Sequence, residues 1–160
     1  MNTHVEELAR RFETANQAMI TVVEQLDDAG MRAHCATEQC TAAALAAHVG
    51  EAHPVIADWV RAAAAGEPLP GITMADIDRI NAEQAIANAE CSKETALAQL
   101  RTNGAAAAAM LRTLQDGDLE RTTPFALFGG SEVSVRTLIE RVLIGNVESH
   151  LPSLQAAAPA

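Results

Sequence analysis

Residues 41–66, TAAALAAHVGEAHPVIADWVRAAAAG, decide the fold class of this chain. Alanine, which has the highest helix propensity of all residues, fills much of the stretch. Thr41 suits the N-cap of a helix, and Gly66 suits its C-terminal end. The inward stripe recurs at steps of three and four residues, which is the period of one helix face; it consists of Leu45, His48, Val49, Ala52, Ile56, Trp59, Val60 and Ala63.

Pro54 interrupts the hydrogen-bond pattern of this predicted helix. Because proline has no backbone N–H, Pro54 leaves the carbonyl of Gly50 without the donor that an ordinary helix would supply. We expect a kink or a loosened turn directly after His48.

Two more helices are predicted near the ends of the chain. An apolar stripe over residues 3–28 predicts the first, and Gly30 suits its C-terminal stop. The last begins near Ser134. Its inward stripe consists of Val135, Leu138, Ile139, Val142, Asn146 and His150. We expect a single domain over residues 1–155 and a disordered tail over residues 156–160.

The middle of the chain predicts one additional helix or one bent helix. Thr73 and Asp76 resemble a capping box for a helix over about residues 74–90, and Ser92 suits the N-cap of a further segment. Residues 116–132 form a loop with room for a short extended hairpin. Since β-branched runs of strand length are absent, the sequence predicts an all-α fold. We expect a four-helix bundle with an additional or bent intermediate helix.

The composition excludes several classes of protein. The chain has 160 residues, which suits one domain, and its formal net charge of −10 with 2% aromatic residues argues against nucleic-acid binding. No stretch approaches the roughly 18 apolar residues of a membrane helix, and the charged N-terminus is unlike a signal peptide. Three cysteines without a CxxC pair do not make a secreted disulfide framework. We expect a cytoplasmic protein with no nucleic-acid or membrane partner.

Polar residues on two inward stripes point to a site. Asn146 and His150 are four residues apart and therefore share one helix face, while His48 lies on the stripe of another helix. Bundles build metal and ligand sites from such inward side chains. From spacing alone two interpretations remain: a site for a divalent cation, or buried histidines that backbone carbonyls or water satisfy.

Other polar and aromatic residues on the same helices are further candidates for this site. Glu51 follows His48 by three residues and suits a third ligand, an orienting group or a base; a solvated surface glutamate is the alternative. Trp59 belongs to the core or lines a cleft. Glu148 points away from Asn146 and His150, and His53 falls about 140° from His48, which predicts a surface position. No serine or cysteine nucleophile with an obvious base is found, so catalytic residues stay unassigned.

Three segments resemble the DinB-like four-helix bundle superfamily. They are residues 40–60 (CTAAALAAHVGEAHPVIADWV), residues 80–100 (INAEQAIANAECSKETALAQL) and residues 134–154 (SVRTLIERVLIGNVESHLPSL). The superfamily includes the N-terminal domain of mycothiol-dependent maleylpyruvate isomerase and related bacterial thiol S-transferases. The resemblance covers nearly the whole chain and implies the four-helix bundle.

The resemblance also implies a metal site and a chemistry. In this family a histidine on the second helix and a pair spaced by four on the last helix bind a divalent metal, often zinc or nickel. His48 matches the first ligand and His150 the last, whereas Asn146 stands where the family has histidine or glutamate. An amide oxygen is the weaker ligand.

Two functions are compatible with this resemblance. One is a metal-dependent transferase that activates a low-molecular-weight thiol such as mycothiol or bacillithiol, because a bound cation favours the thiolate. The other is a non-catalytic small-molecule-binding or stress-associated bundle that has lost its metal. In either case we expect a homodimer.

Overall fold

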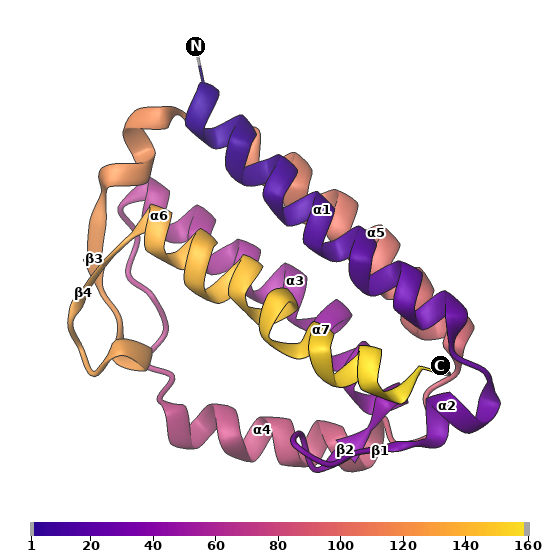
Figure 1. Ribbon diagram of the computed structural model, residues 1–160. Coiled ribbons are helices and arrows are strands. Elements are labelled where there is room, and N and C mark those ends of the chain that lie inside the picture. The colour runs from indigo at the N-terminus through magenta and orange to yellow at the C-terminus, as the bar shows by residue number, and fades with distance from the viewer. Residues whose placement is uncertain (1, 159–160) are drawn as a thin grey trace.

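Four long helices pack into a ring in a computed structural model that describes residues 2–158 (Figure 1). Helix α1 (Thr3–Gln25) lies along α5 (Lys93–Leu111), and α3 (Ala42–Ala65) packs against α5 on the other side. The C-terminal helix lies between α3 and α1 and completes the ring. The predicted all-α bundle is confirmed. Within residues 2–158, no helix combines the length and apolar character that crossing a bilayer requires.

The C-terminal helix changes its winding part-way along. It runs as α6 (Val135–Thr137), a π-helical segment η3 (Leu138–Ile144) and α7 (Gly145–Ala157), so it extends two residues into the segment predicted as a tail. Residues 159 and 160 lie outside the described part. A π-helix bonds residue i to residue i+5. Its buried residues accordingly recur at five-residue steps, as Leu138 with Leu143 and Ile139 with Ile144.

This change of winding corrects the predicted inward stripe. The stripe assumed an unbroken α-helix through Val142 to Asn146 and His150. Val135, Leu138 and Ile139 are buried as predicted. Beyond them Leu143, Ile144 and Val147 fill the core, and Val142, Asn146 and His150 are displaced to the edge of the helix that borders the cavity.

Helix α4 (Met74–Ala87) is the additional intermediate helix, separate from α5. It contains no buried residue, and its main contact with the long helices is with α3. The shorter elements are α2 (Asp28–Arg32), the hairpin of β1 (His34–Cys35) with β2 (Cys40–Thr41), η1 (Asp116–Glu120), and η2 (Ala126–Phe128) within the hairpin of β3 (Thr122–Pro124) with β4 (Glu132–Ser134).

Local capping chemistry sets most helix ends where the sequence predicts them. The hydroxyls of Thr41 and Ser92 accept the backbone N–H groups of the first turns of α3 and α5, and Thr73 with Asp76 forms the complete capping box of α4. Gly66 ends α3 with a φ of 75°. The first helix is a correction: α1 ends at Gln25, and Gly30 lies inside α2, where its N–H donates to Asp27.

Pro54 does not break α3, because a neighbouring helix supplies the missing donor. The side-chain amide of Asn103, on α5, donates to the Gly50 carbonyl at 2.9 Å. Gly50 also lets α5 approach closely, since a Cβ there would lie 3.0 Å from the Cβ of Gln99. This tertiary hydrogen bond satisfies the Gly50 carbonyl at the turn that was expected to loosen, and α3 stays continuous over Ala42–Ala65.

A buried polar link joins α1, α3 and α5. His53 is fully buried, and its Nε2 lies 2.8 Å from the Oδ1 of Asn16, whose Nδ2 donates to the Leu100 carbonyl. The predicted surface position of His53 is thus wrong. Its angle from His48 was correct, but α3 is covered by neighbours on several sides, so a residue about 140° away still faces α1 and α5. Asn16 belongs to the core and was not predicted there.

Gly104 makes room for this link. A Cβ on Gly104 would lie 2.2 Å from the Nδ2 of Asn16, a distance that real Cβ atoms do not adopt. Asn16 cannot move aside freely, because its amide is held by Leu100 and His53.

We predict that Gly104→Ala lowers the free energy of unfolding by about 1–3 kcal/mol, the usual cost of overpacking. Helix propensity alone predicts the opposite sign, a gain of about 1 kcal/mol. Urea denaturation of Gly104→Ala and of Gly117→Ala, which has open space around it, measures the difference. A stabilised Gly104→Ala protein would contradict the tight packing.

The second prediction concerns acid stability. Burial lowers the pKa of His53 from 6.5 to about 4, so between these values the unfolded chain binds more protons than the folded chain. The free energy of unfolding should therefore fall as the pH decreases from about 6.5 to 4, by up to about 3 kcal/mol. Comparing the pH dependence of wild type and His53→Gln isolates this contribution, and parallel profiles would contradict it.

Candidate functional site

A cavity of about 690 Å³ lies between α3, α4, the β3–β4 hairpin and the C-terminal helix. Its walls are mostly apolar and include Ile56 and Trp59 from α3, Ile77 and Ile80 from α4, and Leu127 from η2. Val55 and Met74, which also line it, are about half exposed. A concave apolar space of this size suits a small molecule.

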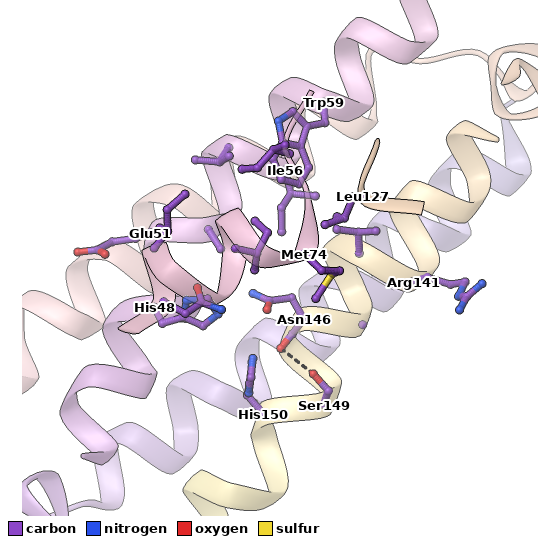
Figure 2. A pocket seen from close by; sticks show the side chains of 18 of the residues that line it. His48, Glu51, Ile56, Trp59, Met74, Leu127, Arg141, Asn146, Ser149 and His150 are labelled. Carbon is purple, nitrogen blue, oxygen red and sulfur yellow. Dashed lines mark hydrogen bonds between the residues drawn. The ribbon is translucent and has the colours of Figure 1, made fainter. Parts of the chain in front are cut away.

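His48, Asn146 and His150 gather at one end of this cavity. Figure 2 shows their side chains converging from α3 and α7. The two imidazole rings meet edge to face, with centroids 5.2 Å apart and planes at 87°. The structure thus brings together the three residues that periodicity selected, although they face a cavity rather than the bundle core.

Glu38 orients His150. The Nδ1 of His150 lies 3.0 Å from Oε1 of Glu38, and the same oxygen accepts a hydrogen bond from the hydroxyl of Ser153 at 3.0 Å. Both partners are about one-fifth exposed. Because an ionised carboxylate only accepts hydrogen bonds, it favours the tautomer with the proton on Nδ1 and leaves Nε2 for another partner.

The environment of His48 favours its neutral form. Burial lowers the pKa of His48, and the neighbouring His150 lowers it further. The neighbouring side chains of Asn146 and Gln84 act on this pKa in the opposite direction. Gln84 lies on α4, so this additional helix takes part in the polar end of the cavity.

Asn146 is the unusual member of the group. Its Nδ2 is buried and has no hydrogen-bond partner in the described part of the chain. A buried unpaired amide costs free energy, which makes such a group in a cavity wall a candidate contact for a ligand.

The other candidate residues, Glu51, Trp59 and Glu148, do not join the group formed by the two histidines and Asn146. Glu51 borders the cavity, but its carboxylate accepts from Asn88 and Gln99 at 3.2–3.5 Å and points away from His150 in Figure 2. Trp59 lies toward the other end and meets Phe125 edge to face at 5.3 Å. Glu148 points away from the cavity, as predicted, and pairs with Arg11.

The thiol of Cys40 lies near the histidines but is poorly suited to react. Cys40 lines a second space of about 100 Å³ that His48 and His150 also border. Burial raises the pKa of Cys40 to about 11. Since the thiolate is the reactive form, this residue is a weak candidate for a nucleophile.

The comparison with protein families agrees with this arrangement. The model of the DinB superfamily matches residues 11–149, most of the chain. The chain belongs to the DinB superfamily. No curated protein and no solved structure matches it.

The metal implied by the DinB resemblance does not fit the residues as they stand. In residues 2–158, no group of three histidine, cysteine, aspartate or glutamate side chains is placed to hold a metal ion. His48 and His150 offer two imidazoles, and the third position is the amide of Asn146, whose unpaired atom is a donor nitrogen. The donor set therefore does not fit a tightly held zinc or nickel ion.

Sequence reasoning missed Glu38, Gln84 and Arg141 in this site. Glu38 lies in the short β1–β2 turn, 112 residues from its partner His150. Arg141 lies in the π-helical segment, and α4 carries Gln84 without a strong apolar stripe. None of these positions has a local pattern that distinguishes it from an exposed polar residue.

Proposed function

We propose that this DinB-superfamily protein binds a small, largely apolar molecule in the cavity, with a polar group of that molecule against His48, Asn146 and His150. The observation that carries this proposal is the cavity of about 690 Å³ with apolar walls and one polar end. Small-molecule sites commonly combine a mostly apolar lining with a few converging polar groups.

The polar end offers chemically distinct groups to such a ligand. Asn146 presents an unpaired N–H donor. In the tautomer that Glu38 favours, the Nε2 of His150 is an acceptor. A hydroxyl or amide group of the ligand would complement both, and its apolar part would cover Ile56, Ile77 and Ile80.

The test uses N-phenyl-1-naphthylamine, a neutral apolar dye whose fluorescence rises in apolar sites. Trp59 is the only tryptophan in the chain and lies in the cavity wall, so energy transfer from Trp59 to the dye reports binding at this place. We predict saturable binding that Ile80→Glu weakens at least about tenfold, since a charge in an apolar site is costly.

The matched control is Ile86→Glu. Ile86 lies on the same helix, is 81% exposed and does not line the cavity, so its variant should bind the dye like wild type. Circular dichroism checks that both variants fold. Absence of saturable binding, or equal binding by Ile80→Glu, would refute the proposed function.

A second candidate function is metal-dependent thiol transfer of the mycothiol or bacillithiol type. It is favoured by the contact of His150 Nδ1 with the Glu38 carboxylate, because metal-binding histidines usually donate their second ring nitrogen to such a group. The substitution by Asn146 counts against it. The homodimer stays a prediction.

Metal content measured by mass spectrometry separates the two candidates. After loading with zinc or nickel and removal of excess, we predict little metal in the wild type and near-stoichiometric metal in Asn146→His, which supplies a third imidazole. His48→Ala in the Asn146→His background should lose it. Stoichiometric metal in the wild type that His48→Ala abolishes would favour thiol transfer over metal-free binding.

A further inference from the structure

Arg141 stands out among the arginines of this chain. Eight others have a carboxylate within salt-bridge distance. Arg141 and Arg32 have none among the described residues. Acidic residues outnumber basic ones by 21 to 11. An arginine without a carboxylate partner is therefore unexpected in this chain. Arg32 lies on the last turn of α2, where a cation is favourable.

Arg141 lies at the rim of the cavity. It is the only lysine or arginine that lines this space, and its guanidinium lies over the ring of Phe128, 5.7 Å from the centroid. Figure 2 shows its side chain leaving the C-terminal helix on the side away from His48. The contact with Phe128, itself a lining residue, holds the cation at the border between the apolar wall and solvent.

The C-terminal helix carries both this cation and two residues of the polar end, Asn146 and His150. Arg141 and Val142 lie in the π-helical segment, and Gly145, Asn146, Ser149 and His150 follow on α7; all six border the cavity. His150 comes nine residues after Arg141. Because the first part of this stretch is π-helical and rises less per residue than an α-helix, the two ends are at most roughly 13 Å apart along the axis.

We propose that the ligand of this cavity carries a carboxylate that pairs with Arg141. This inference rests on the proposed ligand-binding function and specifies the chemical class: an elongated apolar carboxylate with a hydrogen-bonding group at its other end. The guanidinium supplies a bidentate partner for the carboxylate. Without this guanidinium, the net charge of −10 would oppose the binding of an anionic ligand.

The carboxylate that lines the same cavity does not neutralise the charge of Arg141. Glu51 borders the same cavity, but its carboxylate accepts hydrogen bonds from Asn88 and Gln99. Its negative charge is directed to those amides at the junction of α4 and α5. The rim beside Phe128 therefore presents a cation without a carboxylate partner to an entering ligand.

The experiment compares ω-hydroxydecanoate with decanediol, which have the same chain and differ at one end by a carboxylate or a hydroxyl. Each displaces N-phenyl-1-naphthylamine from the wild type, Arg141→Gln and Arg32→Gln. We expect the wild type and Arg32→Gln to bind the carboxylate about five- to tenfold more tightly than the diol, an advantage of the size that a partly exposed bidentate pair provides. Arg141→Gln should lose this preference and bind the diol like wild type.

Several results would overturn the inference while leaving the proposed function intact. They are equal affinity of the wild type for both compounds, failure of both compounds to displace a dye that itself binds, and an equal loss of affinity for both in Arg141→Gln, which would indicate a structural role. Failure of the dye to bind at all would instead refute the proposed function. Raising the salt concentration should reduce the preference in the wild type, because the ion pair at the rim is screened.

Discussion

The close contact of α5 with both α3 and α1 is the constraint on which the rest of the bundle depends. Gly50 and Gly104 remove side chains at the two crossings. The helices therefore lie near enough for Asn103 to reach the carbonyl freed by Pro54, and for Asn16 of α1 to bond both α5 and α3. These polar groups would be unsatisfied in a looser bundle. The packing covers α3 on the sides of α1 and α5 and leaves the side near α4 to form the cavity wall.

The fold was predictable because its elements depend on local chemistry. The N-caps Thr41 and Ser92, the capping box at Thr73 and the C-terminal Gly66 act within about four residues of the helix ends that they define. The position of His53 was not predictable in this way. Its burial depends on how many neighbours surround α3, and the alanine-rich sequence of that helix permits close approach from several directions.

The candidate site was predictable in part for the same reason. His48 and the pair of Asn146 and His150 follow from helical periodicity, since each lies on an apolar stripe. Glu38 and Arg141 do not, because one lies in a turn far along the chain from its partner and the other in a helix segment with altered winding. Irregular elements thus supply Glu38 and Arg141, whereas regular helices supply His48, Asn146, His150 and much of the cavity wall.

The π-helical segment makes the site sensitive to helix winding together with chain length. Residues Leu138–Ile144 follow the i+5 pattern, so the segment holds more residues per turn than an α-helix of the same extent. If this segment kept its length but took ordinary α-winding, everything that follows would rotate by roughly 100° about the helix axis, the step of one residue. Asn146 and His150 would then leave the cavity, although neither had been changed. Deleting one residue together with that change of winding would largely restore their direction, because it removes the extra residue that the wider turn accommodates. In an alignment of related chains, a one-residue gap within this segment would therefore be compatible with an unchanged polar end.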